Sequence, residues 1–456
     1  MKPKLLFLFL ALAYPLQSIG QTSPEGYVLE QITIISRHNV RAPLQKDIDS
    51  TKRNVADTTM LVKFSAPGSN QTQRGGALEM LMGAYFRMWL REEGLLVDYV
   101  KEINKGKETV RDIVPDTTGF RFAASPRERT IASARAFVAG MLPAAEVNIS
   151  HNEIDSRDSR YLPYLVDRSP CPALEIDKRF NIEGFIEEAK KEKRVIEDKY
   201  KSRLEEAYRI LERAVDFPHS ANGGNFHHFF QKSINVDFSF YKDSIIQEPA
   251  ADKYLKAANQ LSDALILQYY ELPYPGSTGL HIHNEEDWHT IASIKDMYSK
   301  LLFAEPIVAV NTSHGLLFEI WKGIKDEQMK LNFICTHDTS ITALLEALQA
   351  EPYELPGFTT LEGLTPVGCK LLFEKYNHKG KYYGRVRLVY QTTEQIRHMT
   401  VLDHQLGSDP ASFPIRFKDM EAVGTEGQYY RWCDLECRMR QTLEAFKKVA
   451  QGKKPF

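Results

Sequence analysis

Apolar residues along the chain form short continuous runs, and most of these runs are followed by a stretch of helical periodicity. Four runs rich in β-branched or aromatic residues predict strands, those at residues 28–36, 119–124, 331–336 and 382–391. Three stretches with apolar positions every three to four residues predict helices, at residues 75–90, 130–142 and 340–348. A strand followed by a helix, three times along the chain, predicts an α/β fold built on a buried sheet.

The middle of the chain has a different pattern, in which helical periodicity dominates from residue 150 to residue 288. Residues 187–215 are densely charged and repeat apolar side chains at three-to-four spacing, which predicts an amphipathic helix with a solvated face. A helix that binds a partner is the alternative interpretation. We therefore expect a mainly helical domain, residues 150–288, inserted into an α/β domain made of residues 21–149 and 289–456.

The first twenty residues have the pattern of a secretory signal peptide. Lys2 and Lys4 precede an apolar stretch at residues 5–16, and small residues stand before a cleavage site at Gln21. An anchoring helix is the alternative, but the stretch is shorter than the roughly 20 apolar residues of a membrane span and contains Pro15. We expect a periplasmic or secreted protein without membrane association after cleavage.

Composition and charge exclude several classes of protein. The chain has 456 residues, of which 43% are hydrophobic and 26% are charged, as in ordinary globular proteins. With 58 Lys and Arg against 60 Asp and Glu, the net charge of -2 gives no basic excess for a nucleic-acid partner. Five cysteines are too few for a dense disulfide framework; Cys433 and Cys437 either pair or stay free, and Cys335 is expected to be a buried thiol.

The sharpest motif is S-R-H-N-V-R-A-P at residues 36–43, where the predicted strand 28–36 ends. Ligands of open α/β sheets bind beyond the carboxyl ends of the strands. Arg37 and Arg41 carry guanidinium groups that bind phosphate oxygens bidentately, so the motif predicts a site for a tetrahedral dianion. Between them, His38 is a candidate phosphate ligand or nucleophile.

Two further groups of residues follow predicted strands. His337 and Asp338 come directly after the strand 331–336 and before a helix, whose start would face a bound anion. A carboxyl group beside a phosphate stays protonated to a higher pH, which suits a general acid. Arg129 follows the strand 119–124 and is a further candidate phosphate ligand, with a solvated charged turn as the alternative.

Together these motifs resemble the histidine acid phosphatases of the histidine phosphatase superfamily, which carry R-H-x-x-R-x-P, a later arginine before threonine, and an H-D pair. The resemblance spans nearly the whole chain after residue 20. It implies a phosphoglycerate-mutase-like mixed sheet flanked by helices, with an inserted mainly α-helical domain. It also implies that His38 becomes phosphohistidine and that Asp338 protonates the leaving oxygen. Four residues would then clamp the phosphoryl group: Arg37, Arg41, Arg129 and His337.

The resemblance also bears on the substrate. Glu248 resembles a glutamate that contacts the sugar in family members acting on sugar 1-phosphates, although a solvated glutamate is an equal alternative. Leu44 and Gln45 stand where phytases of this family commonly have Thr-Lys, which weakens the case for a polyanionic substrate. Arg127, near the expected pocket rim, adds a positive charge, which favours a more anionic substrate. We expect a phosphomonoesterase acting on sugar phosphates such as glucose 1-phosphate.

Other functions and ligands are alternatives. A phytase-type phosphatase has the same site, whereas export argues against a phosphoglycerate-mutase-like transferase. An intact nucleophile and acid argue against a non-catalytic sugar-phosphate binding protein. We expect no cofactor and no metal, since the paired histidines lack ligands at a known spacing: His227, His228, His281 and His283. The partner is a small phosphomonoester, and the chain is expected to be a monomer or homodimer.

Overall fold

In this computed structural model of the 456-residue chain, the structure is described for residues 17–18, 26–104, 107–156, 158, 160–161, 180–223, 229–232, 235–237, 250–272, 280–424 and 428–456. Residues 1–16 and 19–25 lie outside this set, so the signal peptide stays a prediction. Among the described residues no single helix has the length and apolar composition of a membrane span, and one pair of helices bent by 94° passes the same test together.

The centre of the molecule is a nine-stranded sheet. Its strands are β1 (Gln17–Ser18), β2 (Tyr27–Arg37), β5 (Phe120–Ala124), β6 (Ile149–Ser150), β9 (Leu331–Thr336), β10 (Lys370–His378), β11 (Lys381–Tyr390), β12 (Ala411–Pro414) and β13 (Tyr430–Arg431). The order is β1-β12-β11-β10-β2-β9-β5-β6, with β13 beside β11. The strands β2, β9, β5 and β6 run parallel, whereas β10 and β11 are antiparallel to their neighbours, so the mixed sheet is confirmed.

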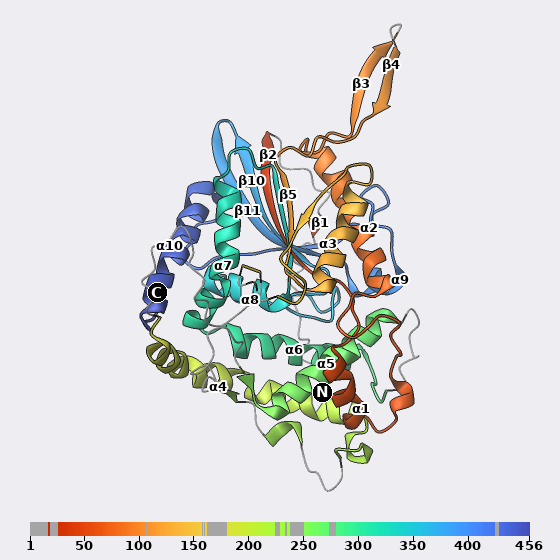
Figure 1. Ribbon diagram of the computed structural model, residues 1–456, viewed down its shortest axis with the longest axis vertical. Helices are drawn as coiled ribbons and strands as arrows, with labels where there is room; N and C mark the ends of the chain where they lie inside the picture. Colours follow the sequence, from red (N-terminus) through yellow and green to blue (C-terminus); the bar gives the residue numbers. More distant parts are fainter. Residues whose placement is uncertain are drawn as a thin grey trace, which may run out of the picture.

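Helices cover both faces of the sheet (Figure 1). On one side lie α2 (Gln73–Glu92) and α3 (Glu128–Met141), and on the other α7 (Pro306–Lys325), α8 (Asp338–Ala347) and α10 (Trp432–Ala450). Two glycines let α2 and α3 approach closely. A Cβ on Gly83 would stand 2.1 Å from the carbonyl oxygen of Phe137, and one on Gly140 equally close to that of Met80. This contact packs the C-terminal half of α3 directly against α2.

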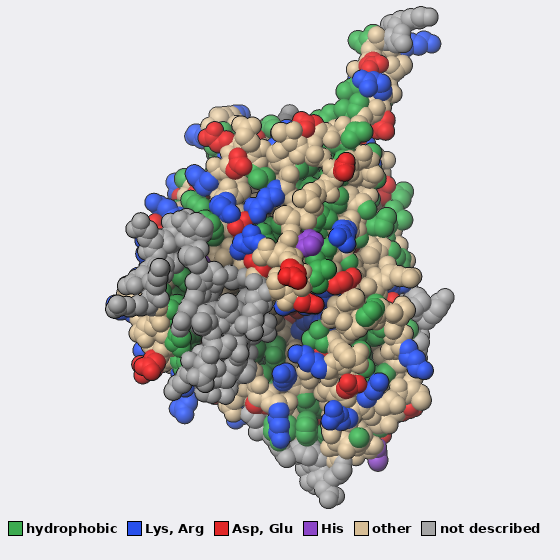
Figure 2. All heavy atoms as spheres, viewed as in Figure 1, with side chains coloured by type: hydrophobic (Ala, Val, Ile, Leu, Met, Phe, Trp, Pro, Cys, Tyr) green, Lys and Arg blue, Asp and Glu red, His purple; other side chains and the backbone are tan. Residues whose placement is uncertain are grey.

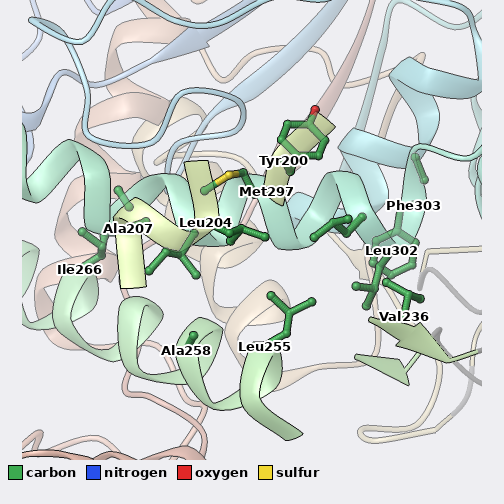
Figure 3. Packing of buried hydrophobic residues seen from close by; sticks show 14 of the residues in the cluster. Tyr200, Leu204, Ala207, Val236, Leu255, Ala258, Ile266, Met297, Leu302 and Phe303 are labelled. Carbon is green, nitrogen blue, oxygen red and sulfur yellow. The ribbon is translucent and has the colours of Figure 1, made fainter. Parts of the chain in front are cut away.

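A layer of helices lies below the sheet and its flanking helices in Figure 1. It consists of α1 (Gln45–Asn54), α4 (Ile182–Ala214), α5 (Lys253–Glu271) and α6 (Glu285–Phe303). Figure 3 shows how Leu204 of α4, Leu255 of α5 and Met297 of α6 meet in one buried cluster. Each fully buried apolar side chain of this size contributes about 2 kcal/mol. Because α6 begins at Glu285, the expected division at residue 288 falls in its first turn, and the two-domain division itself stays a prediction.

Most expected elements appear with small shifts of their ends. The strand at residues 331–336 coincides with β9, and the charged amphipathic helix is α4, which begins five residues earlier than expected. Not predicted were β10, α9 (Thr393–His398) and the short pair β7 (Val236–Asp237) and β8 (Ala250–Ala251). A hairpin of β3 (Tyr99–Asn104) and β4 (Lys107–Asp112) was also missed, and it extends away from the body in Figure 1.

The four described cysteines are free thiols. Cys335 is buried in β9, as expected, and Cys369 is buried as well. Cys433 is exposed and Cys437 is half-buried on α10, and no disulfide joins them. Cys171 lies outside the described residues.

Candidate active site

His38 stands directly beyond the carboxyl end of β2, in the centre of the sheet, with only 3% of its surface exposed. Its Nδ1 lies 2.9 Å from the carbonyl oxygen of Asn39. Because a carbonyl only accepts, Nδ1 carries the proton and Nε2 keeps a free lone pair. Burial, followed by the positive charges of Arg129 and Arg41, holds the pKa of His38 well below its usual range. Both effects favour the neutral imidazole, whose Nε2 can act as a nucleophile.

The peptide that orients His38 is fixed from behind. Asn39 donates its side-chain amide to Glu79 (3.2 Å), and the Nζ atom of Lys370 donates to both oxygens of Glu79 at 2.9 and 3.0 Å. Glu79 and Lys370 are both fully buried. Gly368, at φ +68°, leaves room for this arrangement, since a Cβ there would stand 2.4 Å from the Asn39 amide nitrogen. A buried ion pair thus holds the residue next to the nucleophile.

Arg37 and Arg41 are anchored through their terminal nitrogens. Arg37 donates to Glu362 at 2.7 Å and to the carbonyl of Thr365, and Arg41 pairs with Asp263 at 2.8 Å. The Nε–H of each arginine is buried and has no partner among the described residues. Burial opposes the charge on Arg37, but Asp338 and Glu362 outweigh it and raise its pKa. Each guanidinium is fixed at one end and offers a free donor at the other.

Arg129, in the first turn of α3, differs from these two arginines because no described carboxylate forms an ion pair with it. Its buried Nε–H has no described partner either. Burial and the positive charges of Arg41 and Arg127 lower its pKa. A cation that is desolvated and repelled by its neighbours gains most when an anion arrives.

His337 and Asp338 join the end of β9 to the start of α8. The Nε2 atom of His337 is 3.1 Å from Ser125 Oγ, and burial and Arg129 lower the pKa of the imidazole. Asp338 Oδ2 lies 3.1 Å from Lys295 Nζ and 3.4 Å from Arg37 Nη2. Burial alone would raise the pKa of Asp338, yet these two cations outweigh it and hold that pKa well below its usual range. Next to these cations the carboxylate is the favoured form of Asp338, and a protonated Asp338 beside a bound phosphate stays a prediction.

These residues surround a pocket of about 220 Å³. One side, the sheet wall, consists of His38, Arg41, Arg129, His337 and Asp338. Arg37 does not line the pocket; it is buried behind this wall, 3.4 Å from Asp338. The facing side, the helical wall, consists of Asp47, Asn259, Gln260, Asp263 and Lys295, from α1, α5 and α6. The pocket is smaller than the roughly 300–1,000 Å³ of sites for drug-sized ligands. It suits a phosphoryl group with a small leaving group.

The helical wall contains mostly hydrogen-bonding groups. Gln260 donates to Asp47 at 2.7 Å, and burial followed by the charge of Asp263 raises the pKa of Asp47. Asn259 Oδ1 is buried and has no partner among the described residues. Asp263 bridges Arg41 and Lys295, which outweigh the burial and lower its pKa to about 2. This wall therefore offers acceptors to a ligand, while its lysine is already held by two carboxylates.

The residues expected to contact the leaving group have different positions. Leu44 lines the pocket, whereas Gln45 is exposed at the start of α1 and does not line it. Glu248 lies outside the described residues. Arg127 lines the pocket, and its guanidinium donates to the carbonyls of Pro126 and Ser156. Its charge is therefore partly used to hold the rim.

Four residues of the site were missed from the sequence: Asp47, Asp263, Lys295 and Glu362. None belongs to a motif. Asp263 and Lys295 each stand in a largely apolar helical stretch, L-S-D-A-L-I-L and I-A-S-I-K-D-M. A charge in such a stretch is a signal that could have found them.

The face seen in Figure 2 carries no large patch of one charge. Acidic and basic side chains are interspersed over it, and near its middle Asp and Glu side chains lie beside Lys, Arg and His side chains. Within the described ranges, no three His, Cys, Asp or Glu side chains form a group that could hold a metal ion. That the reaction needs no metal stays a prediction.

Comparisons with known proteins agree with this geometry. A family model, Histidine phosphatase superfamily (branch 2), matches residues 28–391. The chain is 30% identical to a glucose-1-phosphatase of Salmonella typhimurium, covering 88% of this chain and 91% of that one. It is 26% identical to phytase AppA of Escherichia coli, covering 93% and 94%. The phytase structure from Citrobacter braakii superposes with a TM-score of 0.74 at 20% identity, over 91% of this chain and 98% of that one. With these matches over most of its length, the chain belongs to branch 2 of the histidine phosphatase superfamily and is a phosphomonoester hydrolase of the histidine acid phosphatase type.

Proposed function

We propose that the protein hydrolyses sugar phosphates, glucose 1-phosphate among them, through a phosphohistidine on His38. The main support for this proposal is the set of hydrogen-bonding groups in the helical wall. Asp47 and Asn259 Oδ1, which has no partner among the described residues, are acceptors for hydroxyl groups, and Lys295 is already paired with two carboxylates. A leaving group with several hydroxyls and no further negative charge matches this wall. The relative at 30% identity bears the name glucose-1-phosphatase, which supports the same class of substrate.

In the first step we assign four residues to the phosphoryl group: Arg37, Arg41, Arg129 and His337. Phosphoryl transfer has a loose transition state with charge on the equatorial oxygens, so fixed cations supply most of the catalysis. The lone pair on His38 Nε2 forms the N–P bond as the P–O bond to the sugar breaks. Asp338 gives a proton to the leaving oxygen.

In the second step, water attacks the phosphohistidine opposite to the N–P bond. Asp338, now a carboxylate, takes a proton from that water, and His38 leaves with its lone pair restored. The hydrogen bond from Nδ1 to Asn39 keeps the imidazole in the same orientation in both steps. Two in-line displacements replace one difficult hydrolysis.

Rapid-quench trapping tests the intermediate. Labelled phosphate from glucose 1-phosphate should remain on the protein in alkali, where phosphohistidine survives, and should be absent from His38→Ala. That variant should lose at least about 10³-fold in kcat. As a control, His404→Ala changes an exposed imidazole outside the pocket, paired with Asp409, and should behave as wild type. Full activity of His38→Ala would exclude the proposed mechanism.

A phytase-type activity is the second candidate, because Arg127 adds a positive charge at the rim. Comparing kcat/KM for glucose 1-phosphate and phytate decides between the two. We expect a ratio of at least about ten in favour of glucose 1-phosphate, since the lysine of the helical wall is already paired with two carboxylates and is not available to further phosphates. The opposite ratio would make the protein a phytase. Binding without turnover of either substrate would make it a sugar-phosphate binding protein.

We also infer that residues 1–20 direct export, on their charge and hydropathy pattern, and that the segment 150–288 forms a helical domain beside the leaving group. N-terminal sequencing of the mature protein should begin at Gln21.

A further inference from the structure

Lys295, on α6, belongs to none of the sequence motifs that form the sheet wall. Its ammonium group lies between two carboxylates. Its Nζ donates to Asp263 and lies 3.1 Å from Asp338 Oδ2, with 12% of the side chain exposed. The other oxygen of Asp338 accepts the N–H of Thr339 at 2.9 Å. Both oxygens of Asp338 therefore face hydrogen-bond donors.

This arrangement conflicts with the role of a leaving-group acid, which has to carry a proton. The charged and titratable groups that act on Asp338 come from six elements or their ends: Lys295, Asp263, Arg37, His38, Arg129, His337 and Cys369. Lys295 and Arg37 are the nearest cations, and both favour the carboxylate. A proton can reach Asp338 only when this pairing weakens.

We propose that Lys295 couples substrate binding to the protonation of Asp338: it pairs with the carboxylate as the structure shows, and it turns to the phosphoryl oxygens when a substrate binds. This inference rests on the proposed role of Asp338 as the acid. Lys295 lines the same pocket as His38 and Arg41, and a lysine side chain can redirect its ammonium over a few ångströms. A phosphate dianion attracts the ammonium more strongly than a single carboxylate does.

The proton balance closes within the complex. A phosphomonoester has a second pKa near 6, so in acid it arrives as a monoanion that carries one proton. The cationic cluster favours the dianion, and the released proton moves from the phosphate oxygen to Asp338 as Lys295 departs. Asp338 then gives this proton to the leaving oxygen when the P–O bond breaks. The leaving oxygen therefore receives a proton that arrived with the substrate, and the first step needs no other acid.

Lys295→Met tests the coupling through the pH dependence of kcat/KM for glucose 1-phosphate. The productive pair is ionised Asp338 with the monoanionic substrate, so protonation of Asp338 in the free enzyme sets the acid limb. Without Lys295 the carboxylate loses its nearest cation, and the acid limb should move to higher pH by about one unit or more. The alkaline limb reflects the second pKa of the substrate phosphate, so it should not move in the variant. Lys295→Arg keeps the charge and should keep the wild-type profile.

The control is Lys300→Met, five residues further along α6. It removes a lysine that is paired with Glu346 outside this pocket and should leave the profile unchanged. If Lys295→Met does not fold, Lys295→Gln removes the same charge. An unmoved acid limb in the variant that folds overturns the inference. Asp338→Asn separates the two proposals. Full turnover of glucose 1-phosphate by this variant would contradict the role of Asp338 as the acid. If Asp338→Asn is inactive and the acid limb of the Lys295 variant does not move, only the proposed role of Lys295 is contradicted.

Discussion

The two walls of the pocket are built in opposite ways. The cations of the sheet wall are held at the ends of strands or in the first turn of a helix, and several of their N–H groups have no partner among the described residues. The polar groups of the helical wall mostly pair with one another, as Gln260 does with Asp47 and Lys295 with Asp263. One wall presents N–H donors that have no partner among the described residues, and the other presents polar groups that are mostly paired.

This difference indicates a division of work. Every phosphomonoester presents the same phosphoryl group, so the sheet wall should affect all substrates alike. Leaving groups differ between substrates, so changes in the helical wall should alter the ratio between them. Two results would contradict this division: a sheet-wall variant that alters the ratio of kcat/KM between substrates, or a helical-wall variant that lowers kcat/KM equally on all of them.

The largest expected effect concerns the support behind the sheet wall. Lys370→Met leaves Glu79 buried without its cation, and losing one partner of a buried ion pair costs about 3–5 kcal/mol. We expect a matching loss in the free energy of unfolding by urea. Glu79→Gln combined with Lys370→Met removes both charges and should recover most of this loss. A single variant as stable as wild type would mean that the pair does not fix the sheet wall.

The second effect separates activity from stability within the sheet wall. Because Arg129 has no carboxylate partner among the described residues, Arg129→Ala strands no opposite charge and relieves repulsion from Arg41. Its kcat/KM should fall by about 10²–10³ on every phosphomonoester, while its melting temperature stays the same or rises.

The matched control for Arg129 is Arg121, whose guanidinium on β5 pairs with Glu319 at 2.5 Å. Arg121→Ala should lower stability by about 1–2 kcal/mol and leave kcat/KM unchanged. If both variants lost stability and activity together, the main role of the cations in the sheet wall would be to stabilise the fold and not to bind an anion.

The sequence predicts the sheet wall far better than the helical wall, for a physical reason. A buried strand places the residue after it at one edge of the sheet, so the strand pattern alone brings His38 near Asp338. The positions of Lys295 and Asp263 depend on how two helices pack and rotate, which no local periodicity fixes. The antiparallel strand β10 was missed for a related reason, because its neighbour in the sheet is decided by long-range pairing with β2.

A third prediction concerns the buried neutral imidazoles, for which His314 on α7 is a reference outside the pocket. It stacks on Phe446 with 4.0 Å between ring centroids, and burial lowers its pKa to about 4. The unfolded chain takes up this proton near pH 6.5, so the contribution to stability is complete above that pH and is lost as the pH falls towards 4. The loss is about 3 kcal/mol. Unfolding of His314→Phe between pH 7 and pH 4 should show a shallower decline than wild type.

The smallest effect tests the helical wall. Asn259→Ala removes a buried acceptor that has no described protein partner and that we assign to a sugar hydroxyl. Loss of one such hydrogen bond costs about 1–1.5 kcal/mol, so kcat/KM for glucose 1-phosphate should fall about tenfold. The value for p-nitrophenyl phosphate, which offers no hydroxyls, should not change. Asn311→Ala is the matched control, because the Asn311 amide on α7 is also buried without a described partner and does not line the pocket. An equal fall on both substrates would show that Asn259 supports the phosphoryl site, and the two walls would then share one task.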